Sequence, residues 1–326
     1  MSEQATGSDN GQACTGVLVM AHGTPSSLDE LPAFVESIRH GRPLAPEQMA
    51  ALRARYQAIG GCSPLAGITR SQVEGISRAL QARRPGKFVV ALGAKHLSPS
   101  IEDAVGSLVA AGTGHLLGVV LAPQFSAASV AEYERRALAA RSAPGGNRQA
   151  RIDVVASWHL LPGFVSALAR NLRTALDQLP RRSRESALVL FSAHSVPQRL
   201  IDEGDPYARQ VAETAEAVAA LAGIERYEVV FQSAGMTPDP WLGPDIREAI
   251  RSGARGGAMA VVACPVGFVA DHLEVLYDLD VEAAAVAREE GVSFARSASL
   301  NADPELLEAL ADLIIAAEEA RPGDEP

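Results

Sequence analysis

The 326-residue sequence predicts an α/β fold made of two similar halves, each a parallel sheet flanked by helices. Three observations predict it. Short apolar segments alternate with helical patterns along most of the chain, as in parallel sheets. The apparent strand exits at 21–25 and 193–197 both contain an Ala-His pair followed three residues later by Pro. The segments 118–126 and 260–268 match as strand, proline and aromatic residue. We interpret the chain as two copies of one unit.

The first half is expected at residues 14–150, behind a disordered leader at 1–13 that has neither a basic start nor an apolar core. A buried strand at 16–20 opens it. The next helix should begin between residues 27 and 31, with Ser27 and Glu30 spaced as a capping box, and run to about residue 40. The remaining elements are helices at 46–59, 69–84, 101–111 and 129–141, strands at 88–93 and 118–122, and a linker at 142–147.

The second half is expected at residues 151–295. Residues 187–191 and 258–263 are apolar and β-favouring, so both are predicted to be buried strands. The second of these strands ends at Cys264 and Pro265, and a helical pattern follows.

Four acids, Asp271, Glu274, Asp278 and Glu282, follow that strand at spacings of three, four and four. This spacing predicts one row on a helix face. Like charges so placed cost roughly 0.2 to 0.5 kcal/mol per pair, and no Lys or Arg lies among them, so the offsetting charge must come from elsewhere. A solvated helix face is the alternative interpretation. Carboxylates beside the intervening histidine suit a divalent cation or proton transfer, and we predict a site of that kind.

Composition limits the possible partners. A net charge of −10 argues against nucleic acid. Residues 39–55, in contrast, carry five basic side chains against one acid. Such a local patch suits a small anionic ligand, although a solvated pair of helices would also explain it.

The chain has no apolar run of the ~18 residues that a membrane span needs, so we expect a cytoplasmic protein with no integral membrane segment. The three cysteines, Cys14, Cys62 and Cys264, form no Cys-x-x-Cys pair. Reduced thiols are therefore expected, and an iron–sulfur cluster is not.

Ligands of open parallel sheets bind outside the carboxyl ends of the strands. Two halves that face each other would enclose a cleft there, with His22 on one wall and His194 with the acid-rich segment on the other. A loop histidine is more often structural than catalytic, so both roles stay open at this point.

Four stretches carry a family pattern: RYQAIGGCSPLAGIT at 55–69, SAHSVP at 192–197, TPDPWLGPDI at 237–246 and PVGFVADHLEVLYD at 265–278. Together they resemble the ferrochelatase family, whose members insert ferrous iron into a porphyrin. The last stretch is the most specific. The order and spacing of the remaining sequence fit the family from about residue 16 to about residue 316.

The resemblance implies the chelatase fold, which has two Rossmann-like halves with the active-site cleft between them. It implies that the C-terminal segment at 296–320 forms a helix that packs back on the first half. In the family, the residues that match His194 and Glu274 handle the metal and the pyrrole protons, so these two are the expected catalytic pair and metal ligands. Asp278 and Glu282 match acids that continue a metal or proton path towards the surface.

Other positions match family residues that line the porphyrin pocket or meet its carboxylates. His22 stands where the best-known soluble members carry tyrosine, and His40 stands where arginine is common. The axial environment of the product and one carboxylate contact can therefore differ from theirs. The expected porphyrin-binding residues are His22, Arg39, His40, Arg55, Ser63, Lys95, His96, Tyr133 and Trp241.

We therefore expect a ferrochelatase of haem biosynthesis that takes ferrous iron as substrate and holds no tightly bound cofactor. Coproporphyrin III, with four propionates, is favoured over protoporphyrin IX, with two, because residues 24–42 contain no apolar membrane-facing lip and no transmembrane tail is seen. The alternatives are a cobalt or nickel tetrapyrrole chelatase, which the histidine at position 22 would fit, and a non-catalytic porphyrin carrier. A monomer is expected, with neighbouring haem-pathway enzymes as candidate partners.

Overall fold

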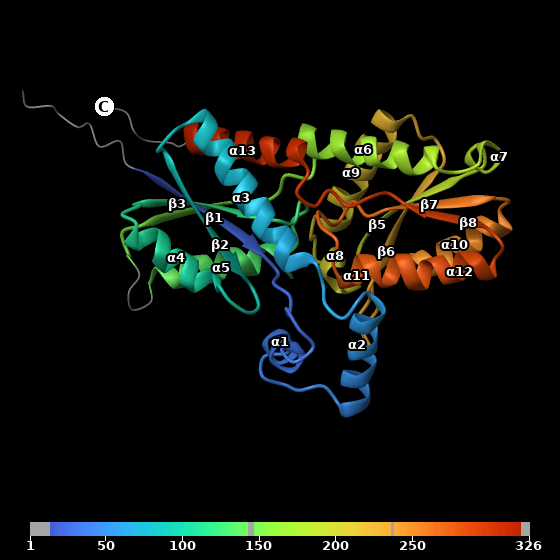
Figure 1. Cartoon of the computed structure of the whole chain (residues 1–326), viewed down its shortest axis with the longest axis horizontal. Coiled ribbons are helices and arrows are strands. Elements are labelled where there is room, and N and C mark those ends of the chain that lie inside the picture. The colour runs from blue at the N-terminus through green and yellow to red at the C-terminus, as the bar shows by residue number, and fades with distance from the viewer. Residues whose placement is uncertain (1–13, 143–146, 236–237, 321–326) are drawn as a thin grey trace, which may run out of the picture.

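Two parallel four-stranded sheets form the frame of the molecule (Figure 1). The computed structural model describes residues 14–142, 147–235 and 238–320. The strand orders are β2-β1-β3-β4 and β6-β5-β7-β8. The predicted α/β fold of two halves is thereby confirmed. The strands are β1 Thr15–Ala21, β2 Phe88–Ala94, β3 His115–Val120, β4 Arg151–Val155, β5 Leu188–His194, β6 Tyr227–Gln232, β7 Ala260–Cys264 and β8 Ser293–Arg296.

The two sheets have the same topology. In each, the first strand along the chain lies between the second and the third, and the fourth lies beside the third. β1 and β5 are therefore equivalent strands, and His22 and His194 stand at their carboxyl ends. The duplication predicted from the two histidine loops is present in the fold, and it brings both loops to the edge where such sheets bind ligands.

The first half extends further along the chain than expected. β4 pairs in parallel with β3, from Arg151 opposite His115 to Val155 opposite Val119. The expected boundary after residue 150 is therefore wrong, because it would separate this strand from its sheet. The leader at 1–13 and residues 143–146 of the expected linker lie outside the described residues.

The helices largely follow the predicted ranges, but the first begins at Leu31 without the expected capping box. Glu30 instead accepts a hydrogen bond from the backbone N–H of Ser26 at 2.7 Å. The helices are α1 Leu31–Ile38, α2 Pro46–Ala58, α3 Leu65–Arg83, α4 Ile101–Ala110, α5 Val130–Arg141, α6 Pro162–Asp177, α7 Arg181–Arg184, α8 Gln198–Asp202, α9 Tyr207–Ala222, α10 Ile246–Arg255, α11 Leu273–Leu276, the π-helix η1 Asp278–Ala283, α12 Ala284–Glu289 and α13 Pro304–Glu319.

One hydrophobic core spans both halves. Alternate strand residues, such as Val17 in β1 and Phe191 in β5, enter it together with the apolar faces of α3, α6, α9 and α13. The intervening strand residues pack against α4 and α5 in the first half and against α10 to α12 in the second. α13 contacts both α3 and α6, so the C-terminal helix packs on the first half and also joins it to the second.

Buried polar contacts also join the halves near the site. Gln124, which is 2% exposed, donates from its side-chain amide to the hydroxyl of Thr214 and to the carbonyl of Val266, each at 3.1 Å. The N–H of Phe125 donates to the side chain of Gln210 at 2.7 Å. These bonds fix the carboxyl edges of the two sheets relative to each other.

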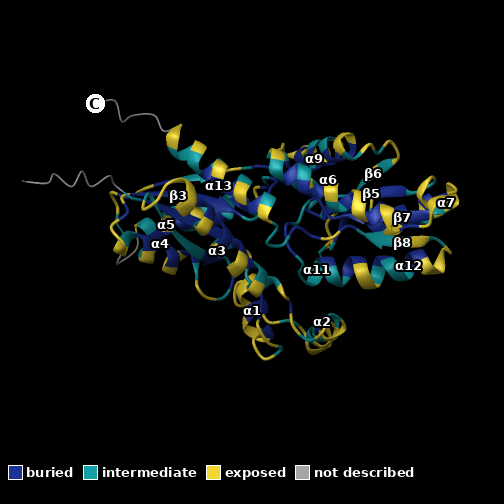
Figure 2. Cartoon of the chain, turned by 45° about the horizontal axis from the view of Figure 1, so that its top comes forward, coloured by how far each residue is buried: buried dark blue, intermediate teal, exposed yellow. Residues whose placement is uncertain are grey.

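α1 and α2 form a lobe that projects from the body of the molecule (Figure 1) and is largely exposed (Figure 2). A small core of its own includes Leu31, Phe34 and Tyr56, and Leu273 of the second half packs against it. The lobe is thereby placed beside α11. No helix in the described ranges is long and apolar enough to cross a membrane.

Candidate active site

The centre of the site is the hydrogen-bonded pair of His194, at the end of β5, and Glu274, in α11. Nδ1 of His194 donates to Oε2 of Glu274 at 2.9 Å, and Nε2 of His272 lies 3.8 Å from the same oxygen. The backbone of the pair is also held. The Tyr207 hydroxyl donates to the carbonyl of His194 at 2.9 Å, and the Gln232 amide donates to the carbonyl of Glu274 at 2.8 Å.

The two side chains shift each other's pKa. Burial favours the neutral form of Glu274, but His194 and His272 outweigh it and hold the pKa of the carboxyl well below its usual range. Burial also opposes charge on His194, but Glu274 outweighs it and raises the pKa of the imidazole. Because Nδ1 donates to the carboxylate, Nε2 is the nitrogen that can accept a proton. The pair can therefore act as a base. When His194 accepts a proton, the neighbouring Glu274 carboxylate compensates its positive charge.

His22 approaches from the first half. Its Nδ1 donates to the carbonyl of Gly23 at 3.0 Å, and its ring centroid lies 4.8 Å from that of His96 and 5.9 Å from that of Phe34. Burial is the main influence on the pKa of His22 and lowers it, while Glu274 acts in the opposite direction. His22 is therefore a neutral imidazole within electrostatic reach of the carboxylate on the other half.

Solvent reaches these three side chains although protein lies close around them. The side chains of His194 and Glu274 are 38% and 33% exposed, and His22 is also exposed. Desolvation by surrounding protein is nevertheless the largest influence on all three pKa values. The site is therefore open to a ligand between the two halves.

The predicted single row of acids is wrong. The backbone is helical only from Leu273, and α11 passes into the π-helix, in which the N–H of Glu282 donates to the carbonyl of Tyr277 at 3.0 Å. The wider π turn breaks the expected three-four spacing. Asp271 precedes the helix and bonds to Ser299 at 2.7 Å.

The offsetting charge does come from outside the segment, as expected. Arg296 binds Asp271, Arg55 binds Asp278, and an Arg247 nitrogen lies 3.7 Å from Glu282. Within the described ranges, no three His, Cys, Asp or Glu side chains are grouped so as to hold a metal ion. The four residues predicted to be metal ligands thus do not form one preassembled metal centre.

Arg55 links the lobe to the π-helix. Its guanidinium bonds to Asp278 and lies 4.5 Å from the centroid of the Tyr277 ring. The hydroxyl of Ser233 donates to the other oxygen of Asp278. Asp278 is 5% exposed, and this burial raises its pKa to about 6 in spite of Arg55. The lobe is therefore tied to the acid that follows Glu274 along the chain.

Asp278→Asn is expected to make the free energy of unfolding less dependent on pH. Because burial raises the pKa of Asp278 from 3.8 to about 6, the folded protein binds this proton more tightly than the unfolded chain does. The contribution to stability is complete below about pH 4 and is lost as the pH rises through about 6, and it amounts to about 3 kcal/mol. Urea unfolding of both proteins at a series of pH values between about 4 and 8 measures it.

The control is Asp177→Asn, which also removes an acid paired with an arginine but one whose side chain is 72% exposed. Parallel stability curves for the wild type and Asp278→Asn across this pH range would contradict the prediction.

Lys95, His96 and Tyr133 lie close together in the first half. Nζ of Lys95 lies 2.8 Å from Glu132 and 5.5 Å from the centroid of the Tyr133 ring. Tyr133 is 5% exposed and packs in the core of the first half, so it supports Lys95 from below. His96 is buried, shares a hydrogen bond of 2.8 Å with Ser37, and has its pKa lowered by burial to about 3. Its ring packs against that of His22.

Three other predicted residues have local partners, and a fourth, His40, is exposed. Nε of Arg39 donates to the carbonyl of Arg42 at 3.1 Å, and Arg39 and His40 are exposed beyond the end of α1. Ser63 is buried and accepts from the N–H of Leu65 at 3.3 Å. Trp241 pairs through its backbone with Pro197, next to the His194 loop. The structure brings none of these four into direct contact with the described parts of His194 or Glu274.

Several residues at the centre carried little sequence signal. Tyr207 reaches the site only through the tertiary fold, whereas His272 is the histidine that the sequence already places among the predicted acids. Gln232 could have been found, because it is the polar residue that ends β6, the neighbour of β5. In such sheets, a polar residue that ends the strand next to a histidine-ending strand is therefore a useful indication of a site residue.

Comparisons with known proteins identify the family of this chain. Residues 14–318 match the family model for ferrochelatase. The chain is 42% identical over 302 residues to the coproporphyrin III ferrochelatase of Anoxybacillus flavithermus, covering 92% of this chain and 95% of the relative. It is 41% identical over 302 residues to the coproporphyrin III ferrochelatase of Bacillus subtilis, covering 92% and 96%. It is 42% identical over 303 residues to the ferrochelatase of Deinococcus radiodurans, covering 92% and 94%.

Among solved structures, the chain resembles the sirohydrochlorin chelatase SirB from Bacillus subtilis subspecies spizizenii in complex with cobalt, with a TM-score of 0.55 over 95% of this chain and 98% of that one. The two are 12% identical, so this likeness concerns the fold alone. The match to the family model over almost the whole chain and the identity to its curated members show that this chain belongs to the ferrochelatase family.

Proposed function

We propose that this protein inserts ferrous iron into a porphyrin, and that coproporphyrin III is the porphyrin, in haem biosynthesis. The observation that carries the proposal is the solvent-accessible pair of His194 and Glu274 facing the neutral imidazole of His22. Family membership supports the reaction. The relatives named coproporphyrin III ferrochelatase support the choice of porphyrin.

The reaction exchanges two protons for one iron ion, because a porphyrin must lose both pyrrole protons before all four nitrogens can bind Fe²⁺. Nε2 of His194 accepts a proton, and Glu274 stabilises the positive charge that this histidine gains. His272 flanks the same carboxylate, and we propose that it takes the second proton. The protein that surrounds the pair on its other sides strengthens this electrostatic effect.

Iron does not need a complete set of protein ligands at this place, since the ring supplies four nitrogens. One imidazole or carboxylate from the wall is enough to help strip water from the ion. Asp278 and Glu282 follow Glu274 in the π-helix. We propose that they guide iron or protons, and that the ion pair of Arg55 with Asp278 opens when they do. The shared core and the bonds from Gln124 make the walls stiff, which suits a site that holds the ring in a strained form.

Coproporphyrin III is expected to react with a kcat/KM about tenfold higher than that of protoporphyrin IX. Its two additional propionates can each gain up to about 1 kcal/mol from exposed basic groups such as Arg39 and His40 at the end of α1. The measurement is the initial rate of iron insertion under anaerobic conditions, with each porphyrin varied in turn. Faster turnover with protoporphyrin IX would overturn the substrate assignment but leave the reaction in place.

The same assay separates the other candidate functions. A series of Fe²⁺, Co²⁺ and Ni²⁺ with one porphyrin is expected to favour Fe²⁺, and a clear preference for cobalt or nickel would indicate a different chelatase. Tight porphyrin binding without insertion of any ion would identify a carrier.

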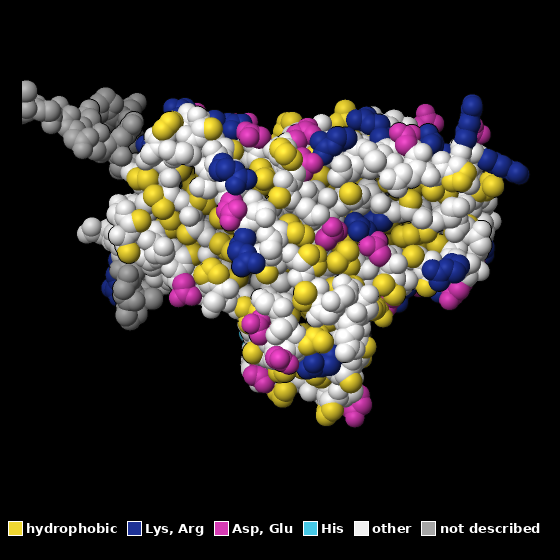
Figure 3. Space-filling view, viewed as in Figure 1, with side chains coloured by type: hydrophobic (Ala, Val, Ile, Leu, Met, Phe, Trp, Pro, Cys, Tyr) yellow, Lys and Arg dark blue, Asp and Glu magenta, His cyan; other side chains and the backbone are white. Residues whose placement is uncertain are grey.

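We also propose that the protein works in the cytoplasm as a monomer, with porphyrin and iron as its small-molecule partners and neighbouring haem-pathway enzymes as candidate protein partners. On the face shown in Figure 3, acidic and basic side chains are interspersed, which gives no broad basic surface for nucleic acid. We propose that it needs no resident cofactor and no iron–sulfur cluster. Cys264 is buried, and burial raises the pKa of its thiol to about 12.

A further inference from the structure

The segment that carries Glu274 has little support from its own helix. α11 contains four residues and leads directly into a π-helix of six. A π turn is rare and is usually kept at functional sites. The position of the Glu274 carboxylate must therefore depend on side chains outside the segment.

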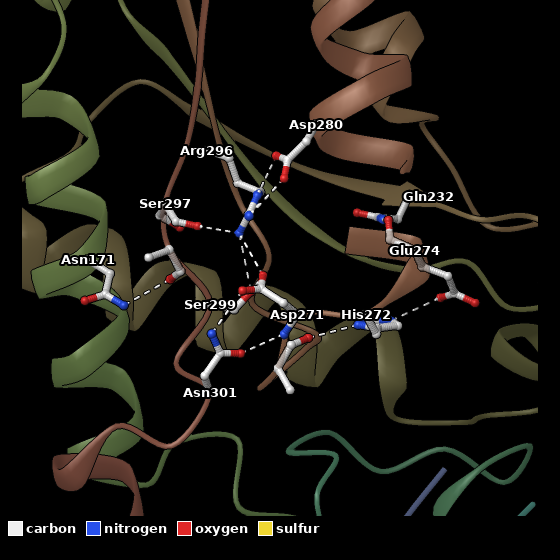
Figure 4. Close-up of polar contacts among 12 residues, drawn as sticks. Asn171, Gln232, Asp271, His272, Glu274, Asp280, Arg296, Ser297, Ser299 and Asn301 are labelled. Carbon is white, nitrogen blue, oxygen red and sulfur yellow. Dashed lines mark hydrogen bonds and ion pairs between the residues drawn. The ribbon is translucent and has the colours of Figure 1, made fainter. Parts of the chain in front are cut away.

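Arg296, the last residue of β8, holds this segment at both sides of Glu274 (Figure 4). Its Nε and Nη2 donate to the two oxygens of Asp280, in the π-helix, at 2.7 and 3.0 Å. Its Nη1 lies 3.2 Å from Asp271, which is three residues before Glu274. The Arg296 side chain is only 14% exposed. One guanidinium thus joins the two ends of the segment.

Asp271 is itself held by hydrogen bonds from both its side chain and its backbone. It accepts from the hydroxyl of Ser299 at 2.7 Å and from the side-chain amide of Asn301 at 3.0 Å, and its own N–H donates to the side-chain oxygen of Asn301 at 2.8 Å. The loop at 297–301 is fixed in turn. Gln72 of α3 donates to the carbonyl of Asn301 at 2.9 Å, and Asn171 of α6 donates to the carbonyl of Ala298 at 3.0 Å.

We infer that Arg296 is a positioning residue for Glu274. Through Asp271 and Asp280 it holds the carboxylate at hydrogen-bond distance from His194, without contacting the reacting groups itself. The inference rests on the proposed function, in which Glu274 serves iron insertion. A functional group must be held within about 0.5 Å of its productive place, and a displacement of about 1 Å can cost about 10²-fold in rate.

Arg296→Met is expected to lower kcat for iron insertion by about tenfold to 10²-fold, with the KM for porphyrin within about threefold of the wild type. Arg296→Lys, which keeps the charge but loses the forked geometry, is expected to recover part of kcat. Asp280→Asn removes only the π-helix end of the contact. Its side chain is 38% exposed, so this variant tests the inference even where Arg296→Met does not fold.

The matched control is Arg83→Met. Arg83 also binds two carboxylates, Glu308 and Asp312, but joins α3 to α13. An unchanged kcat in Arg296→Met and Asp280→Asn, or an equal loss in Arg83→Met, would overturn the inference.

Amide hydrogen exchange of the ligand-free proteins gives a readout that does not depend on turnover. Peptides covering 271–282 are expected to exchange faster in Arg296→Met than in the wild type and Arg83→Met. Unaltered exchange there would also overturn the inference. A wild type that inserts no iron would instead refute the proposed function, and the exchange experiment would still decide whether Arg296 holds the segment.

Discussion

Glu274→Gln is expected to remove most iron insertion, by about 10² to 10⁴ in kcat, while porphyrin binding stays within a few-fold of the wild type. Glutamine keeps the shape of the side chain but carries no charge. Glu274 is the carboxylate that raises the pKa of His194, and its own pKa is held low by His194 and His272 in spite of burial. Without it, a proton on His194 would be an uncompensated charge in a crowded site, so the barrier to pyrrole deprotonation rises.

The rate is measured anaerobically from the absorbance of the metallated porphyrin, and binding from the fluorescence of the porphyrin titrated with protein. Glu213→Gln is a matched control. Glu213 also bonds to a histidine, His159, at 2.8 Å, but it lies in α9 and not in α11 beside His194. Turnover equal to that of the wild type in Glu274→Gln would mean that the carboxylate is only part of the wall.

The frame of the site was predictable because it depends on local patterns. Apolar strands of period two and the repeated histidine loops are visible in the sequence, and parallel topology then places the strand ends on one edge. His22 and His194 thus reach the site through rules that need only element order. The catalytic pair followed from the resemblance together with the position of Glu274 after β7.

The details of the acid-rich segment were not predictable, because a three-four spacing assumes an α-helix throughout. The π-helix after Tyr277 and the extended backbone at His272 depend on contacts with distant residues. The need for outside positive charge was visible in the sequence, but its source was not. Arg55 lies 223 residues from Asp278 along the chain, and local spacing carries no information about such a contact.

Burial also shows that residues of one motif can have different roles. Tyr133 and Ser63 were expected to line the porphyrin pocket, yet both are nearly buried and bond or pack within the first half. A motif indicates that a residue matters, but it does not show whether the residue contacts the ligand or packs against a neighbouring residue. Asp271 illustrates the same point, since it belongs to the acid spacing but serves the loop at 297–301.

His194→Ala is expected to stop iron insertion, and His22→Ala is expected mainly to change the spectrum and release of the product. Loss of His194 removes Nε2, the base paired with Glu274, and should cost about 10² to 10⁴ in kcat. His22 lies on the opposite half, its pKa is lowered by burial, and its Nδ1 donates to Gly23, which leaves the Nε2 lone pair for iron already held by the ring. His22→Ala should therefore shift the absorption bands of the bound product and speed its dissociation.

Both outcomes are read from one experiment, in which the enzyme is mixed anaerobically with porphyrin and Fe²⁺ and full spectra are recorded through turnover and product release. His159→Ala is the control for loss of a histidine away from the site, since His159 pairs with Glu213 on α9. The hydrogen bond from His22 to its own loop is present, so a purely local role predicts product spectra that superimpose for wild type and His22→Ala. Superimposed spectra would assign His22 to the loop, and full turnover in His194→Ala would move the base elsewhere, with His272 as the nearest imidazole to Glu274.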